Sequence, residues 1–268
     1  MTRRDPTRSV HVLRILPLLA LVAACACAPA ARGGQGGSDP KAIAVAEDVM
    51  KALGGRERWE ALPGLRWQFG STVNDTLRGA PRKHVWDKMT GRHRVEGVTR
   101  DGVKWRFVHT VGDTLHGQAW MNGTAIEGDS LHKLIRRAEA LWINDTYWLL
   151  MPYKLRDRGV TLKYDGEKVE GQTTYDVLGL SFGNVGMTPG DRYWVYVDRA
   201  NHHVERWEMV LQGDQPPPVV YTWDGWMESG GLLFPTEHHT QRGNDVINLY
   251  TGPVEALTKF LPGDFTGP

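Results

Sequence analysis

The sequence predicts a mainly β protein in which one long, curved antiparallel sheet is covered by helical segments. Three observations lead to this expectation. Short runs with apolar residues at every second position recur from residue 65 onwards, and Gly, Asn or Asp ends most of them, as in hairpin-connected strands. Helical spacing is found only near residue 40 and in one central stretch. About 230 residues remain after an export-type N-terminus, which suits a single domain with a sizeable core.

Residues 1–24 have the features of a secretory signal. A start with four arginines precedes the apolar run ILPLLALVAA, which is too short to span a bilayer, since that takes about 20 residues. The following VAAC resembles the lipobox of bacterial lipoproteins, which implies cleavage before Cys25 and attachment of a lipid to its sulfur. A plain signal cut after Ala26 is the alternative. By resemblance to the common sorting rule, Ala26 in place of Asp favours the outer membrane.

The charge and the cysteines of the remaining chain exclude several classes of function. Four of the 32 Lys+Arg and one of the 31 Asp+Glu lie in residues 1–24, so the mature chain has 28 basic and 30 acidic residues, a net charge of −2. The sequence has no cluster of positive charge of the kind that a nucleic-acid partner requires. The two cysteines are Cys25 and Cys27, so the predicted domain has neither an internal disulfide nor a thiolate nucleophile.

The first elements after the signal are a linker and a helix. Residues 25–38 contain APAARGGQGGS, which is typical of a flexible tether. Asp39-Pro40 offers an N-cap acceptor and a proline in the first turn, and apolar residues at helical spacing follow until Gly54-Gly55 ends the helix. A second short helical turn is expected at 56–62, so the predicted domain spans 39–268.

Strands are expected on both sides of the central helical stretch. Twist accumulates in a sheet of about 11 strands, which must therefore curl or close, and its concave face needs cover. The runs lie at 65–73, 83–89, 92–98, 102–112, 114–122 and 123–128, and then at 159–166, 174–182, 191–199, 203–212, 219–227, 231–240 and 245–254.

The central stretch is the natural cover for that concave face. Helical spacing begins near Ser130, and the segment Trp142–Met151 is apolar on nearly all sides, so we expect it to be buried as a plug. Asn144 or Asp145 is expected to cap a short second helix, because a buried carboxylate without partners is costly. Pro152 is expected to end that helix.

The order of these elements resembles a known superfamily. An export signal, an amphipathic helix ending in LGG, a Trp soon after it and a many-stranded sheet with a helical insert are similar to the LolA/LolB-like half-barrels. The segments WINDTYWLLMPYKLRDRGV, YDVLGLSF and TPGDRYWVYVD resemble one family of bacterial lipoproteins in this group. Over residues 39 to about 256, the resemblance implies an unclosed half-barrel whose cavity accepts acyl chains.

Aromatic residues in the strands and the insert are the candidate ligand-binding residues. Aromatic rings give large contact area, which suits an acyl chain or lipid, although the same rings also suit a filled core. The candidates are Trp67, Phe69, Trp86, Trp105, Phe107, Trp120, Trp142, Trp148 and Trp194.

Motifs for metal binding and hydrolysis give little support to an enzyme. The pairs at 202–203 and 238–239 are adjacent strand residues, which point to opposite faces, and no zinc-site pattern occurs. His84, His93 and His109 lie on separate strands and could converge, although nothing in the sequence requires it. Gly179–Gly183 matches G-x-S-x-G around Ser181, but no helix follows the strand as a nucleophile elbow needs.

The sequence therefore predicts a lipoprotein and favours a binding protein over an enzyme, without deciding between them. It would be anchored through Cys25 to the periplasmic face of the outer membrane and would bind a hydrophobic small molecule or lipid in an aromatic-lined cavity, without a metal or cofactor. An envelope hydrolase acting on lipid or glycan and a structural lipoprotein with a filled core are the alternatives. Ligand identity, protein partners and oligomeric state are not readable from the sequence.

Overall fold

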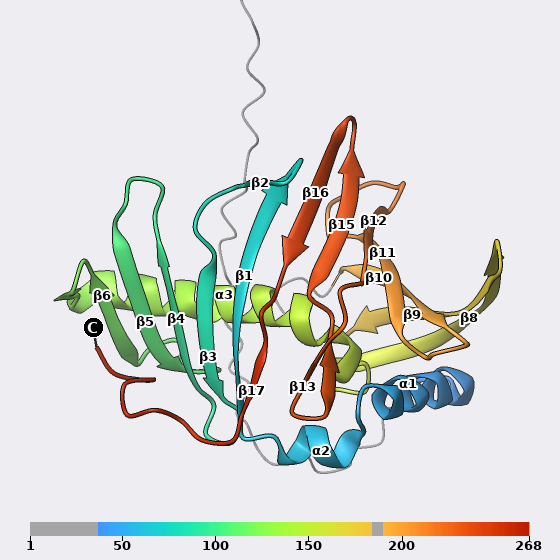
Figure 1. The fold of residues 1–268 in the computed structure, drawn as a ribbon, viewed down its shortest axis with the longest axis horizontal. Helices are drawn as coiled ribbons and strands as arrows, with labels where there is room; N and C mark the ends of the chain where they lie inside the picture. The colour runs from blue at the N-terminus through green and yellow to red at the C-terminus, as the bar shows by residue number, and fades with distance from the viewer. Residues whose placement is uncertain (1–36, 184–189, 268) are drawn as a thin grey trace, which may run out of the picture.

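The computed structural model describes residues 37–183 and 190–267, in which antiparallel strands curl around one long helix (Figure 1). The helices are α1 (Pro40–Ala52), α2 (Arg56–Ala61) and α3 (Gly128–Lys154). The strands before α3 are β1 (Gly64–Val73), β2 (Thr76–Leu77), β3 (Arg82–Asp87), β4 (Arg92–Val98), β5 (Lys104–Thr110), β6 (Gly117–Met121) and β7 (Thr124–Ala125). Those after it are β8 (Val160–Glu170), β9 (Thr173–Phe182), β10 (Arg192–Asp198), β11 (Val204–Val210), β12 (Val219–Thr222), β13 (Met227–Ser229), β14 (Leu232–Phe234), β15 (Glu237–Arg242), β16 (Asp245–Tyr250) and β17 (Glu255–Leu257).

Two sheets join into one curved surface. The first has the order β15-β16-β1-β3-β4-β5-β6-β7, with β2 and β17 also paired to β1, and the second has the order β12-β11-β10-β9-β8. They meet where the amide of His239 donates to Thr222 Oγ1 (2.9 Å) and where Asp224 forms a bridge with Glu237. Among the described residues β7 and β8 do not pair, so the surface stays open. The predicted curved, unclosed antiparallel half-barrel is confirmed.

The pleat of the first sheet separates a concave face from an outer face. Residues directly opposite each other on paired strands share a face. In the register, Trp67 lies opposite His84, and His93 lies opposite Trp86 on one side and His109 on the other. These residues therefore share the face toward α3. The outer face carries a second row, in which Gln68, Lys83, Glu96, Arg106 and Trp120 are paired in turn from β1 to β6.

Helix α3 covers the concave face (Figure 1) and has two unlike halves. In residues 128–144 the buried side chains are those of Ile135, Ala138 and Trp142, and the remainder are partly or fully exposed. In residues 145–154 most side chains are buried. The N-terminal half is therefore an amphipathic helix lying on the sheet, and the C-terminal half is a core helix.

The predicted division of this segment into two helices is wrong. Asn144 and Asp145 lie in the middle of one continuous helix, so neither caps a second one. Asp145 instead reaches across to Arg82 on β3, and this ion pair satisfies the carboxylate without a helix end. Pro152 does not end the helix either, because it falls in the last turn and α3 continues to Lys154.

Two helix starts also differ from expectation. The N-cap of α3 is Glu127, so the helix begins at Gly128, two residues before Ser130, near which helical spacing begins in the sequence. Asp39 is the N-cap residue of α1, but its side chain makes no capping hydrogen bond. Its Oδ2 accepts the backbone amide of Tyr164 at 2.9 Å, which joins the start of α1 to β8.

Gly54 ends α1 for two physical reasons. Its φ is +111°, which L-residues with a side chain rarely adopt. A Cβ at this position would lie 2.2 Å from the carbonyl oxygen of Gly231, so the β13–β14 hairpin approaches too closely for any side chain. The predicted stop at Gly54-Gly55 is confirmed.

Apolar side chains form three separate clusters. The main core lies around the C-terminal half of α3, α1 and the second sheet. A small core lies under the N-terminal half of α3 and contains Val95, Trp105, Phe107, Ala119 and Ala138. An outer cluster of Val85, Val108, Leu257 and Phe265 lies beneath the C-terminal segment.

The predicted signal at 1–24, Cys25 and most of the predicted tether lie outside the described residues. Within those residues, no helix combines the length and the apolar character that crossing a membrane requires.

Candidate functional site

A chain of buried and partly buried ionisable side chains connects α3 to three neighbouring strands of the first sheet. We call it the histidine cluster. Its members are Arg82 and His84 on β3, His93 on β4, His109 on β5, and Glu139 and Asp145 on α3.

Asp145 forms one end of the histidine cluster. Its side chain is fully buried, and Arg82 binds it in a bidentate manner, with Nε 2.6 Å from Oδ2 and Nη2 2.7 Å from Oδ1. The amide group of Asn144 also donates to Oδ1 at 2.9 Å, and Nε2 of His84 lies 3.0 Å from Oδ2. A buried carboxylate needs such partners, because desolvation of an unpaired charge is costly.

The three imidazoles follow in a row of hydrogen bonds. Nδ1 of His84 lies 3.0 Å from Nε2 of His93, and Nδ1 of His93 lies 2.9 Å from Nε2 of His109. An ionised carboxylate only accepts hydrogen bonds, which assigns the proton of His84 to Nε2. Its Nδ1 must then accept from His93, and Nδ1 of His93 must accept from His109. All three neutral rings therefore carry their proton on Nε2.

This assignment leaves Nδ1 of His109 as the proton-accepting end of the histidine cluster. The atom is buried and lacks a hydrogen bond of ordinary geometry in the described part of the chain; Oε2 of Glu139 lies 3.4 Å away, and, against the effect of burial, the backbone at Thr110 and Asp113 acts to raise the pKa of the ring. Oε2 of Glu139 also accepts the amide of Gly112 at 3.1 Å. A proton on the carboxyl group of Glu139 would donate to Nδ1 of His109 and complete the row.

Burial sets the protonation of the histidine cluster. Desolvation lowers the pKa of His84, lowers that of His93 well below its ordinary value, and lowers that of His109 to about 4. Burial also raises the pKa of Glu139. For Asp145 burial would raise the pKa, but the hydrogen bond from His84 and the charge of Arg82 together lower it. At neutral pH the rings are neutral and Asp145 is ionised.

Tryptophan rings enclose the histidines. The ring of Trp67 stacks on His84 with centroids 4.6 Å apart and planes 9° apart. Trp142 lies over His93 with centroids 5.0 Å apart and also contacts Trp86. These rings exclude water from the row, and they join it to the main core, to which Trp67 and Trp142 belong.

The histidine cluster is not arranged as a metal centre. In the described ranges no group of three or more His, Cys, Asp or Glu residues is placed to hold a metal ion. The ring nitrogens point at one another at 2.9–3.0 Å, which is hydrogen-bond geometry. Ligands of a zinc ion would instead converge on a common point about 2.0–2.1 Å from each nitrogen.

Seven of the nine predicted ligand-binding residues fall into three places, and whether any of the nine binds a ligand stays a prediction. The histidine cluster is surrounded by the rings of Trp67, Trp86 and Trp142, and the ring centroid of Phe69 lies 4.7 Å from Cζ of Arg82. The small core contains Trp105 and Phe107, and the main core contains Trp148. Trp120 and Trp194 lie apart from these rings. The first is in the outer row, and the second shares a face with Arg192 instead of its buried neighbours.

Residues that could form a hydrolase triad are not brought together. Ser181 lies in strand β9 opposite Thr161, and its side chain is exposed. Asp145 and His84 are fully buried beneath α3. The G-x-S-x-G letters around Ser181 therefore describe a strand, as expected from the missing helix.

The three histidines of the histidine cluster stand out in the sequence, but the sequence does not place them together. Their common signal is that each lies at an inward position of a strand, two residues from an apolar inward residue: Trp86 for His84, Val95 for His93 and Phe107 for His109. The hairpin turns set the register, and the register brings His93 opposite His109. Asp145 carries a similar signal, since it is the acidic residue in a helical segment that is otherwise apolar there.

Comparison with known proteins gives a structural likeness and no sequence match. No family model matches the chain, and no curated protein matches it. A DUF1329 family protein from Desulfovibrio piger is similar in structure, with 12% identity, a TM-score of 0.50 and coverage of 85% of this chain and 98% of that one. A LolA superfamily protein from Nitrosomonas europaea has 11% identity, a TM-score of 0.49 and coverage of 84% and 97%.

The sheet order, the open edges and the helix on the concave face agree with the fold that the sequence resemblance implied. The chain has a LolA-like half-barrel fold.

Proposed function

We propose that this chain is an envelope lipoprotein that binds a hydrophobic ligand, such as an acyl chain, on the concave face beneath the N-terminal half of α3. The small core carries this proposal. Trp105 and Phe107 stack there with centroids 4.8 Å apart, next to Val95 and Ala119. Such an apolar and aromatic surface suits an acyl chain, and the amphipathic half of α3 covers it.

The N-terminal half of α3 has the properties of a lid. Its buried side chains are Ile135, which lies against β6, Ala138, which belongs to the small core, and Trp142 near its end, which belongs to the main core. Ile135 Cδ1 would lie 2.5 Å from a Cβ on Gly117, so the helix fits closely on β6. Segments with few buried apolar contacts open at lower free energy than the rest of a domain. A ligand that binds the open state would then displace this half of the helix.

The test is detection of direct contacts between an acyl chain and the small core. We would label the alanine and valine methyl groups of the mature chain, carrying Cys25→Ala, and add dodecanol. Intermolecular nuclear Overhauser effects to Val95 and Ala119 are the expected result. Dodecanol that makes no contact with either methyl group would contradict the proposal and favour a structural lipoprotein with a filled core.

A variant that loosens the lid makes the test sharper. Ile135→Ala destabilises the closed state by about 2–5 kcal/mol, because it removes buried packing, and so raises the population of the open state. Because each 1.4 kcal/mol is a factor of ten in an equilibrium constant, we expect dodecanol to bind about tenfold more tightly or better. Leu162→Ala in the main core is the matched control, which should lower stability without raising affinity. Equal affinities of the two variants would argue against a lid.

The second part of the proposal is the anchor. The lipobox-like VAAC supports attachment of a lipid to Cys25 and a place at the periplasmic face of the outer membrane. Cys25→Ala should abolish labelling with palmitate and release the protein from the membrane pellet. A variant that keeps the label and still sediments with the outer membrane would contradict the assignment and point to Cys27.

A further inference from the structure

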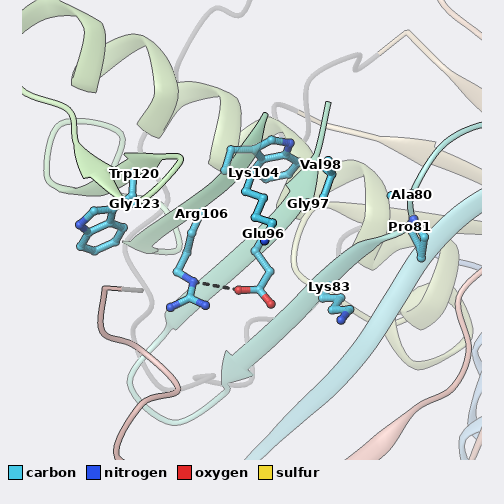
Figure 2. A pocket seen from close by; sticks show the side chains of 11 residues that line it. Ala80, Pro81, Lys83, Glu96, Gly97, Val98, Lys104, Arg106, Trp120 and Gly123 are labelled. Atoms are coloured by element: carbon cyan, nitrogen blue, oxygen red, sulfur yellow. Dashed lines mark hydrogen bonds and ion pairs between the residues drawn. The ribbon is translucent and has the colours of Figure 1, made fainter. Parts of the chain in front are cut away.

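A pocket of about 360 Å³ lies on the opposite side of the first sheet from α3, at the end where β3 begins and β4 ends (Figure 2). Its floor is part of the outer row, in which Lys83, Glu96, Arg106 and Trp120 are successive cross-strand partners. Figure 2 shows Trp120 at one side of this floor and Ala80 and Pro81 at the other. The volume lies in the range of small-molecule sites, about 300–1,000 Å³.

The charges in this pocket are unbalanced. Glu96 is occupied, because Arg106 Nε donates to its Oε2 at 2.8 Å and Arg94 Nε lies 3.8 Å from the same oxygen. The ammonium groups of Lys83 and Lys104 make no hydrogen bond or ion pair with any residue that the structure describes. The ammonium groups of Lys83 and Lys104 are therefore free to bind an anion, because the charges of Glu96 and Arg106 in the pocket floor compensate each other.

The remaining lining is apolar. Pro81, Val98 and the ring of Trp120 contribute the side walls, and Trp105 also borders the pocket. A small inorganic anion would leave these surfaces uncovered, and a neutral chain would leave the lysines unpaired. A protein partner would need an interface well beyond one pocket, on the order of 1,200 Å² in total.

We propose that this pocket binds an anionic amphiphile, that is, a single acyl chain with a carboxylate or phosphate head group. The chain lies against Trp120, Val98 and Pro81, and the head group pairs with Lys83 and Lys104. This site is on the other face of the sheet from the small core, with Trp105 bordering both, and its head-group lysines take no part in the acyl site beneath α3.

The experiment compares probes that share one chain and differ in head group. Dodecanoate, dodecyl phosphate, dodecanol and dodecyltrimethylammonium are titrated below their micelle concentrations into the mature chain carrying Cys25→Ala. The methyl signals of Ala80 and Val98 report the pocket, and those of Val95 and Ala119 report the concave face. Both anionic probes should shift Ala80 and Val98 with at least tenfold higher affinity than dodecanol or the cationic probe, and acetate or inorganic phosphate should cause no shift.

Substitution of the two lysines then tests the head-group site. The double variant Lys83→Gln with Lys104→Gln should bind dodecanoate at least tenfold more weakly and leave dodecanol binding unchanged. Lys51→Gln with Lys133→Gln removes two exposed lysines from α1 and α3 and is the matched control, which should bind like the parent. A preference for dodecanoate over dodecyl phosphate, or the reverse, identifies the head-group source.

Three results would overturn the proposal. These are unchanged dodecanoate affinity in the Lys83/Lys104 double variant, equal affinity for dodecanol and dodecanoate, and no shift of Ala80 and Val98 with any probe. Shifts confined to Val95 and Ala119 would also overturn it, while supporting the separate acyl site beneath α3.

Discussion

At the residue scale, Asp145 explains how a polar group comes to lie in the middle of an apolar helix. A buried carboxylate at position 145 needs partners, and the partners expected from the sequence were the free amides at the start of a second helix. The structure supplies Arg82 and His84 from β3 instead. The difference could not be predicted, because Arg82 precedes Asp145 by 63 residues and the strand register decides their contact.

The first prediction concerns the charge of this residue. Asp145→Asn removes the partner of Arg82, whose side chain is 28% exposed. Loss of one partner of a buried pair costs about 3–5 kcal/mol, so with this exposure we expect roughly 3 kcal/mol less free energy of unfolding in urea. Asp113→Asn is the control, since its partner His116 is 83% exposed and exposed pairs contribute about 0–1 kcal/mol. Similar costs for the two variants would show that the Arg82 pair is not important.

The second prediction concerns pH. Burial lowers the pKa of His84, His93 and His109 from 6.5, the last to about 4, so the unfolded chain binds protons at a higher pH than the folded chain. Their contribution is complete above about pH 6.5 and is lost as the pH falls toward 4. For His109 alone, the free energy of unfolding at pH 4 is roughly 3 kcal/mol lower than at neutral pH. The raised pKa of Glu139 acts in the opposite direction, since its contribution is lost as pH rises.

Melting temperatures recorded between pH 4.5 and 8 check this expectation. The parent chain should lose most stability below pH 6.5, and His93→Leu should be less stable at all pH values but show a shallower decline. His116→Gln, at an exposed position, should keep the decline of the parent. A decline in His93→Leu as steep as in the parent would place the titrating groups elsewhere.

At the element scale, α3 shows which local signals fail inside a core. Asn144, Asp145 and Pro152 indicated a helix break, yet the helix continues through all three. The burial of Leu149, Leu150 and their neighbours holds the segment helical, because tertiary packing outweighs single-residue propensity. The prediction that this segment plugs the concave face depended on its all-round apolar character, and it is confirmed.

The third prediction tests the C-terminal half of α3 as a core element. The ring centroid of Trp148 lies 4.6 Å from that of Trp207 and 4.8 Å from that of Tyr221. Trp148→Ala should therefore lower the free energy of unfolding by about 3–5 kcal/mol. Trp194→Ala is the matched control on the outer face, with an expected cost of about 1 kcal/mol. Urea unfolding measures both. An intact free energy of unfolding in Trp148→Ala would contradict the assignment of this half to the core.

At the scale of the whole molecule, period-two runs and the two helical stretches were sufficient to predict a curved antiparallel sheet around a central helix. The positions of glycine and asparagine located the turns, as at Gly54. The histidine cluster was not predictable in the same way, because it requires the register of three strands and the face of α3 at once.

We propose that α3 is a core helix from residue 145 and a displaceable lid before it. Native-state hydrogen exchange of the α3 amides measures this directly, because local opening exchanges amides without global unfolding. We expect amides in 132–143 to exchange on the order of 100-fold faster than those in 146–154, with the change near Asp145. Uniform protection along α3, equal to that of strands β9 and β10, would contradict the claim.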